Sequence, residues 1–329
     1  MSPLPAIETE GLTKKFGRST AVDDVDLYVP QGTVYALLGT NGAGKTTTVR
    51  MLATLMRRDS GRARVFGYDV EDEATAVRGL IGVTGQYASV DEDLTARENL
   101  VIFGRLVGSS GRAARARAAD LLDEFGLAAA ADRAVRHFSG GMRRRLDLAA
   151  SMITRPRLLF LDEPTTGLDP RTRKQMWETV RRLVSAGSTV LLTTQYLDEA
   201  DELADHIAVM DRGRVVADGT AAELKARVGD TSVTLTLSDP TCATSAMAIC
   251  APFACGDVVL EGAEPRVVVP IAGTDVLPEL HYELRAGGIE LDAVTVGRPS
   301  LDEVFFALTD GDVSARPDTG PSDTQRGAA

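Results

Sequence analysis

A glycine-rich segment at residues 39–46 has the spacing of a loop that binds phosphate groups. An apolar run at 34–38 precedes it and apolar residues at helical spacing follow it, so the loop joins a buried strand to a helix. Glycines let backbone N–H groups converge on phosphate oxygens, and the helix N-terminus adds a favourable dipole. Lys45 could then reach the β- and γ-phosphates of a nucleotide, and the Thr46 hydroxyl could bind Mg²⁺. The residues assigned to the site are Gly39, Thr40, Asn41, Gly42, Ala43, Gly44, Lys45, Thr46 and Thr47. A plain strand-to-helix turn is the alternative, and it is disfavoured because spacing and context agree.

Two adjacent carboxylates, Asp162 and Glu163, end a second apolar run at 158–161. A carboxylate at the carboxyl end of a strand beside a phosphate loop can hold Mg²⁺ through its water shell, and the next residue can face the attacking water. We therefore assign Asp162 to the metal and Glu163 to water activation. A capped turn is the alternative, and the presence of Lys45 in the same chain argues against it.

A short segment of Ser139, Gly140, Gly141 and Met142 precedes apolar residues that recur at helical spacing from 146 to 153. Exposed N–H groups at a helix N-terminus form a second candidate anion site. A serine N-cap followed by flexible glycines is the alternative. That alternative leaves unexplained why two such sites occur in one chain.

The order of these motifs resembles that of the ABC-transporter nucleotide-binding domain, over about residues 4 to 312. A closer resemblance is to the daunorubicin/doxorubicin-resistance ATP-binding subunits of actinobacterial drug exporters. The segments that carry it are residues 83–91, 139–146, 194–201 and 301–308. The resemblance implies ATP and Mg²⁺ as cofactors and ATP hydrolysis coupled to transport.

The resemblance also implies roles for residues outside the phosphate loop. Phe16 matches an aromatic that stacks on adenine, although a plain core or surface aromatic is the alternative. Gln86 matches a glutamine that contacts Mg²⁺ and the water, near the place where the membrane partner docks. The segment 139–142 matches a signature that closes on the γ-phosphate of the opposite subunit's ATP. Asp169, in a segment shortly after Glu163, is assigned to the catalytic set.

One residue departs from the family pattern, because Gln195 follows the apolar run 189–194 where a histidine is usual. Glutamine can hydrogen-bond a phosphate oxygen but cannot carry a proton near neutral pH. Gln195 is kept in the catalytic set. We expect hydrolysis to be slower than usual or to depend wholly on Glu163.

Composition narrows the class of protein further. The 329 residues carry a formal net charge of −11, which argues against nucleic-acid binding and against a polybasic membrane anchor. No apolar run approaches the roughly 20 residues of a membrane-spanning helix, so a cytoplasmic chain held at the inner face of the membrane by a permease is expected. Cys242, Cys250 and Cys255 form no CxxC pair and are expected to be structural thiols.

The expected fold is an α/β P-loop ATPase core with an antiparallel β subdomain and an inserted helical subdomain. The nucleotide-binding domain is placed at 1–228, with the helical subdomain at about 92–155. Residues 229–312 read as a small α+β domain whose order βαββαβ suggests a ferredoxin-like fold. Residues 313–329 have Val313 as their one large apolar side chain and are expected to be a disordered tail.

The function expected from these observations is an ATPase subunit of an exporter for a hydrophobic drug or antibiotic. Its partners would be a separate transmembrane permease and a second copy of the chain, with no nucleic acid. Three alternatives stay open. They are a non-transport ABC ATPase, a nucleotide-gated regulatory binding module for which Gln195 is the one favouring feature, and an importer subunit.

Overall fold

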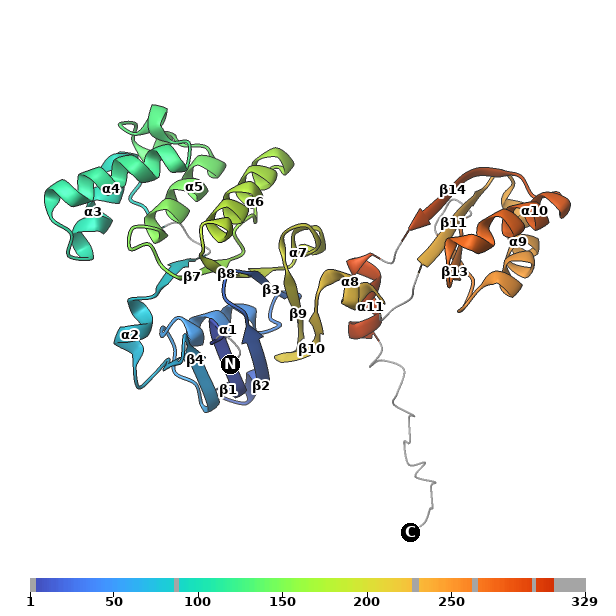
Figure 1. Ribbon diagram of the computed structural model, residues 1–329, viewed down its shortest axis with the longest axis horizontal. Coiled ribbons are helices and arrows are strands. Elements are labelled where there is room, and N and C mark those ends of the chain that lie inside the picture. The colour runs from blue at the N-terminus through green and yellow to red at the C-terminus, as the bar shows by residue number, and fades with distance from the viewer. Residues whose placement is uncertain (1–3, 86–88, 227–230, 262–265, 298–299, 311–329) are drawn as a thin grey trace, which may run out of the picture. The chain divides into compact units, whose positions relative to one another are not determined.

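The computed structural model describes residues 4–85, 89–226, 231–261, 266–297 and 300–310. The chain forms two compact units, Met1–Leu224 and Lys225–Ala329. The domain boundary expected at 228–229 lies outside the described residues, as do Gln86 and the expected tail at 313–329. Figure 1 shows the helices and strands of both units.

A six-stranded sheet in the order β10-β9-β3-β8-β7-β6 forms the centre of the first unit. Its strands are β3 (Val34–Leu38), β6 (Ile81–Thr84), β7 (Leu158–Asp162), β8 (Thr189–Thr194), β9 (His206–Asp211) and β10 (Arg214–Gly219). Neighbouring strands run parallel, except that β10 is antiparallel to β9. Every residue of β3, β7 and β8 is buried, as expected of parallel strands covered on both faces. The strands predicted at 34–38 and 158–161 are confirmed. The carboxyl ends of β3, β8 and β7 therefore meet at one edge of the sheet.

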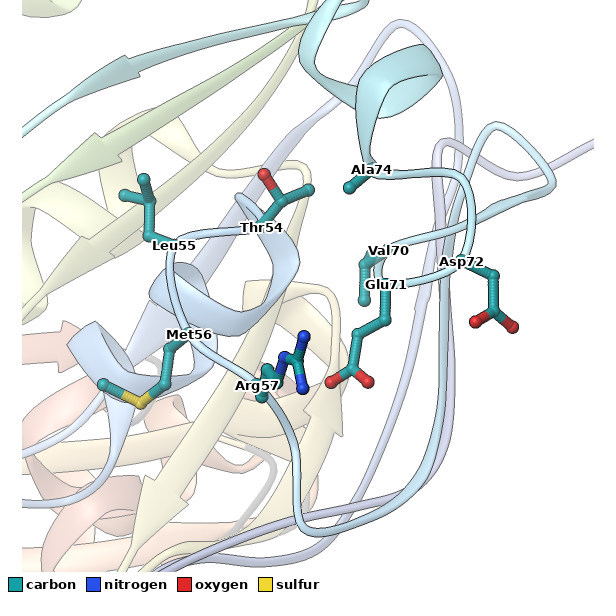
Figure 2. Close-up of a pocket in the computed structure, with 8 residues that line it drawn as sticks. All are labelled: Thr54, Leu55, Met56, Arg57, Val70, Glu71, Asp72 and Ala74. Atoms are coloured by element: carbon teal, nitrogen blue, oxygen red, sulfur yellow. The ribbon is translucent and has the colours of Figure 1, made fainter.

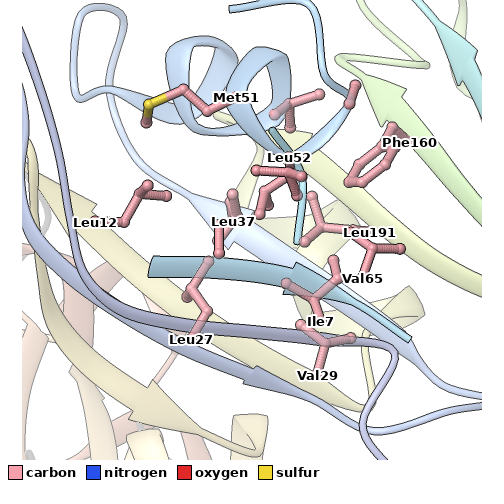
Figure 3. Packing of buried hydrophobic residues seen from close by; sticks show 14 of the residues in the cluster. Ile7, Leu12, Leu27, Val29, Leu37, Met51, Leu52, Val65, Phe160 and Leu191 are labelled. Atoms are coloured by element: carbon pink, nitrogen blue, oxygen red, sulfur yellow. The ribbon is translucent and has the colours of Figure 1, made fainter. Parts of the chain in front are cut away.

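An antiparallel sheet in the order β2-β1-β4-β5 is the second layer. It consists of β1 (Ile7–Phe16), β2 (Ser19–Val29), β4 (Ser60–Val65) and β5 (Tyr68–Asp69). Side chains alternate between buried and exposed from Val25 to Val29 of β2, as expected of a half-exposed antiparallel strand. Side chains of this sheet, of helix α1 (Lys45–Leu52) and of the central sheet form one apolar core; Figure 3 shows Ile7, Val29, Leu52 and Phe160 within it. Through Val49, Met51 and Leu52, this core packs α1 against the two sheets.

Helices between residues 96 and 151 form a group of their own. They are α3 (Ala96–Leu106), α4 (Gly111–Glu124) and α5 (Gly140–Ser151), with the single turns η1 (Ala128–Ala130) and η2 (Val135–His137) between α4 and α5. Thr95 and Glu98 form a capping box at the start of α3, and Ser139 caps α5. Residues 96–151 are thus mainly helical. The remaining helices of this unit are α2 (Ala74–Arg78), α6 (Pro170–Ser185), α7 (Leu197–Leu203) and α8 (Ala221–Ala226), whose last two residues belong to the second unit.

The second unit contains an antiparallel sheet in the order β12-β13-β11-β14. Its elements are β11 (Thr231–Leu237), η3 (Pro240–Cys242), α9 (Ala243–Cys250), η4 (Ala251–Phe253), β12 (Val259–Glu261), β13 (Arg266–Ile271), η5 (Thr274–Val276), α10 (Leu277–Ala286), β14 (Leu291–Gly297) and α11 (Leu301–Asp310). Val233, Leu235 and Val269 of the sheet share a core with Leu280 and Leu284 of α10. Within the described ranges of the chain, every helix is too short or too polar to cross a membrane.

Candidate active site

The glycine-rich loop lies between β3 and α1, at the edge where the parallel strands end. Gly42 and Gly44 have φ angles of +85° and +106°, a region that favours glycine. A Cβ on Gly39 would lie 2.4 Å from the Met210 carbonyl oxygen, and one on Gly44 would lie 2.4 Å from the Ala21 carbonyl oxygen. Backbone conformation and close packing therefore both require glycine here.

Lys45 is held across this loop. Its side chain is buried, and Nζ donates hydrogen bonds to the carbonyl oxygens of Gly39 (2.7 Å) and Thr40 (3.0 Å). Burial lowers the pKa of Lys45 from its ordinary value, while the charges of Glu163 and Asp162 oppose that shift. A phosphate group brought to the loop would give this buried ammonium an anionic partner.

Asp162 lies where β7 ends and is bonded to hydroxyls from two other elements. Thr46 Oγ1 donates to Asp162 Oδ1 at 3.0 Å, and Thr193 Oγ1 donates to the same oxygen at 2.6 Å. A threonine hydroxyl beside one carboxylate fits Mg²⁺, which keeps several waters and takes its other ligands from substrate phosphates. Thr193 was not predicted, because its contact follows from the register that pairs it with Asp162 in neighbouring strands.

Glu163 adopts a left-handed backbone conformation, with φ of 49°. Its N–H donates to the carbonyl oxygen (3.2 Å) and to Oγ1 (3.1 Å) of Thr193. Thr166 Oγ1 donates to Glu163 Oε2 at 3.2 Å, a contact that the sequence motif did not indicate. The backbone of Glu163 is thus held from β8, and its carboxylate is held from its own loop.

A cavity of about 340 Å³ opens over the phosphate loop. It is lined by Phe16, Ala21, Asn41, Gly42, Gly44, Lys45, Thr46, Thr47 and Glu163. Phe16 is about half exposed, so one side of its ring is accessible for stacking. The structure therefore brings the predicted lysine, Mg²⁺-binding threonine, glutamate and aromatic side chains to one opening.

A larger cavity of about 420 Å³ lies elsewhere in the first unit and is shown in Figure 2. Its lining consists of Thr54, Leu55, Met56, Arg57, Val70, Glu71, Asp72 and Ala74. Glu71 and Asp72 would repel phosphate groups, and no residue of the glycine-rich loop lines it. The smaller cavity is therefore the better candidate for a nucleotide.

Gln195 and Asp169 occupy different surroundings. The N–H of Gly39 donates to the Thr194 carbonyl oxygen at 3.2 Å, which places Gln195 directly after a residue bonded to the phosphate loop. Asp169 caps α6 and accepts hydrogen bonds from the N–H groups of Arg171 and Thr172. The side-chain hydrogen bond from Thr172 lowers the pKa of Asp169. Asp169 is not among the residues that line the cavity.

The segment 139–142 begins α5, and its residues do not line this cavity. Ser139 Oγ accepts from the N–H of Met142 at 3.3 Å, so the N-cap interpretation holds for the serine. The two glycines differ. A Cβ on Gly141 would lie 2.2 Å from Thr172 Cγ2, whereas one on Gly140 would meet no atom within 4 Å. Gly141 is therefore needed for packing, and the space at Gly140 is open to an approaching group.

A buried carboxylate supports the loop that follows Glu163. Glu199 Oε1 accepts hydrogen bonds from Thr165 Oγ1 (2.8 Å) and Trp177 Nε1 (3.0 Å). Burial raises the pKa of Glu199. Its position one turn into α7 gave no signal of this role in the sequence, because the contacts join three separate elements.

Comparison with known proteins places these features in a family. Residues 22–166 match the family model described as ABC transporter. The chain is 55% identical over 315 residues to the daunorubicin/doxorubicin resistance ATP-binding protein of Streptomyces peucetius, covering 93% of each chain. It is 45% identical over 310 residues to the doxorubicin resistance ATP-binding protein of Mycobacterium tuberculosis, covering 92% of this chain and 93% of that protein. The linearmycin resistance ATP-binding protein of Bacillus subtilis is 35% identical over 305 residues, covering 92% of this chain and 98% of that protein.

Solved structures give the same result for the first part of the chain. An ATP-binding subunit of an ABC transporter matches with a TM-score of 0.60 and 29% identity, covering 68% of this chain and 92% of that one. An ATP-binding cassette in its ADP conformation matches with a TM-score of 0.61 and 26% identity, covering 67% of this chain and 92% of that one. The mixed α/β fold is thus that of known nucleotide-binding cassettes.

Proposed function

Because this chain belongs to the ATP-binding subunits of ABC transporters, we propose that it hydrolyses ATP at the cavity over the phosphate loop to drive drug export. The chain is an ATPase of this family, and the three relatives described above are resistance proteins for drugs and antibiotics. The observation that carries the assignment of the site is the meeting of Lys45, Thr46 and Glu163 at one opening, with Asp162 hydrogen-bonded to Thr46.

Each residue of the site has a chemical role in this proposal. The loop N–H groups and Lys45 bind the phosphates of ATP, and Phe16 stacks on the base. Thr46 and Asp162 hold Mg²⁺, which would neutralise charge on the phosphates when bound. Glu163 orients the attacking water and accepts its proton. Gln86 belongs to the proposed Mg²⁺ site by family resemblance alone.

Assembly with partners completes the proposal. Two copies of the chain would face each other, so that residues 139–142 of one contact the ATP of the other, and Asp169 would belong to the catalytic set. The open space at Gly140 and the absence of this segment from the lining of its own cavity support that arrangement. A separate permease would hold the dimer at the cytoplasmic face of the membrane.

The second unit would be a ferredoxin-like accessory domain, and residues 92–155 would be a helical subdomain of the cassette. The strand order β12-β13-β11-β14 and the element order β-α-β-β-α-β support the first assignment. The group of α3, α4 and α5 supports the second.

Drug export is tested by measuring doxorubicin retained in cells that express the chain with its membrane partner. Cells with the wild-type chain should retain less doxorubicin than cells with Glu163→Gln, because the variant would bind ATP without hydrolysing it. Equal retention together with normal ATPase activity would contradict doxorubicin as a substrate while leaving the ATPase assignment intact.

The alternative of a regulatory binding module rests on Gln195. If Gln195 donates a hydrogen bond to the γ-phosphate, Gln195→Ala should slow hydrolysis about 10- to 100-fold, the scale of losing a bond of ~1.5–3 kcal/mol to a charged group. Gln195→His should retain activity and acquire a pH dependence near the ordinary imidazole pKa of about 6.5. The steady-state rate of ATP hydrolysis, measured over a range of pH for each variant, gives both the loss of rate and the pH dependence. An alanine variant with the wild-type rate would show that Gln195 takes no part.

A further inference from the structure

A largely buried arginine outside the cavity, Arg144, donates hydrogen bonds to four main-chain carbonyl groups. It lies in the second turn of α5, and its side chain is 12% exposed. The accepting oxygens belong to Gly85 (2.7 Å from Nη1), Pro164 (2.9 Å from Nε), Asp162 (3.0 Å from Nη2) and Glu163 (3.1 Å from Nη2). Four of the five N–H groups of a guanidinium can be used in this way.

Three of these carbonyls belong to consecutive residues, 162–164, which form the loop that carries Glu163. The left-handed conformation of Glu163 is unfavourable for a residue with a Cβ, and such a conformation persists only where surrounding contacts enforce it. Thr193 holds the N–H of Glu163, and Arg144 holds its carbonyl group. The two contacts fix the peptide units on both sides of its Cα.

Asp147, which lies three residues after Arg144 on α5, contacts both Arg144 and the segment at Ser89. Its Oδ2 lies 3.6 Å from Arg144 Nη1, and its Oδ1 accepts from the N–H of Ser89 at 2.8 Å. Burial raises the pKa of Asp147, and the charge of Arg144 opposes that shift. The pair thus bonds α5 to Gly85 and Ser89 as well as to the loop at 162–164.

We propose that Arg144 is a positioning residue for hydrolysis, which aims the Glu163 carboxylate by holding the carbonyls of its loop. The proposal rests on the role proposed above for Glu163. Through Arg144 the base is tied to the helix that starts at Ser139. Arg144 does not line the nucleotide cavity, so its replacement should slow the chemical step and leave nucleotide affinity nearly unchanged.

Arginine is the side chain that this geometry requires. Its planar fork donates in several fixed directions, whereas the single nitrogen of lysine cannot reach four carbonyls that belong to two separate segments. Arg144→Lys keeps the charge in the buried position and removes the fork, so it is the sharper test. Arg144→Gln is a second variant without the charge. Arg145→Gln is the control, because Arg145 donates to the Phe125 carbonyl oxygen and to none of residues 162–164.

The test measures kcat and KM for MgATP with the full-length chain. Arg144→Lys and Arg144→Gln should each lower kcat about 10- to 100-fold, the scale of misplacing a catalytic group by about 1 Å. KM should stay within about threefold of wild type. Arg145→Gln should hydrolyse ATP like wild type. A wild-type kcat in both Arg144 variants, or a KM that rises in proportion to the lost rate, would overturn the positioning role.

A double-mutant cycle separates positioning from general destabilisation. If Arg144 acts through Glu163, adding Arg144→Lys to Glu163→Gln should cause no further loss in the residual rate. A full multiplicative loss in the double variant would overturn the proposal. A wild-type rate in Glu163→Gln alone would instead overturn the assignment of the base, so failure of the proposed function is distinguished from failure of this inference.

Discussion

Replacing Glu163 by glutamine should lower ATP hydrolysis by about 100- to 10,000-fold, the usual contribution of a general base. Glutamine keeps the size of the side chain and can still accept a hydrogen bond from Thr166 Oγ1. It cannot accept a proton from water. The change leaves the Lys45 and Thr46 side chains in place, so ATP binding should be retained. Phosphate release and nucleotide binding are both measured on the purified chain.

Glu178→Gln makes the same chemical change at an exposed position of α6 and serves as the matched control. It should hydrolyse ATP like wild type. Glu163→Gln with the same rate as this control would mean that another group activates the water.

Replacing Lys45 by methionine should weaken ATP binding about 10- to 100-fold, which corresponds to losing a charged hydrogen bond of ~1.5–3 kcal/mol. Methionine nearly fills the same buried space, but it cannot bond to Gly39, Thr40 or a phosphate oxygen. Hydrolysis should fall at least as far as binding, since the lysine also balances charge that develops on the phosphates. Equilibrium titration with ATP measures the affinity.

Lys174→Met changes an exposed lysine of α6 and should bind ATP like wild type. An unchanged affinity in Lys45→Met would contradict the placement of phosphates at the glycine-rich loop. The two lysine variants together separate loss of the site from a general effect of net charge.

Much of the site could be predicted because its strongest signals are local in the sequence. The glycines and Lys45 form one contiguous motif, and Asp162 and Glu163 directly follow a buried strand. Parallel strands place both motifs at one edge of the sheet. Contacts between elements that are far apart in the sequence could not be predicted in the same way. The Thr193 contact depends on the register between β7 and β8, and the Arg144 contacts depend on how α5 packs against the loop at 162–164.

The fold shows the same division. Apolar runs such as β3 and β8 are visible in the sequence because all of their side chains are buried. Strand β4 was not predicted, since only Ala63 and Val65 among its six residues are buried and its other residues are exposed. Strand β10 is similar, because only Ala217 and Gly219 are buried. Strands with so few buried residues carry too short an alternation for the hydrophobic period to identify them.

The most direct test of the account is a single turnover of ATP on the wild-type chain. The protein is mixed with Mg²⁺ and with labelled ATP at a lower concentration than the protein. The bound nucleotide is then identified over time, both with and without the membrane partner. We expect wild type to convert the bound ATP to ADP and Glu163→Gln to retain it as ATP. Wild-type protein that binds ATP and releases it unchanged under both conditions would contradict the assignment of this site as an ATPase centre.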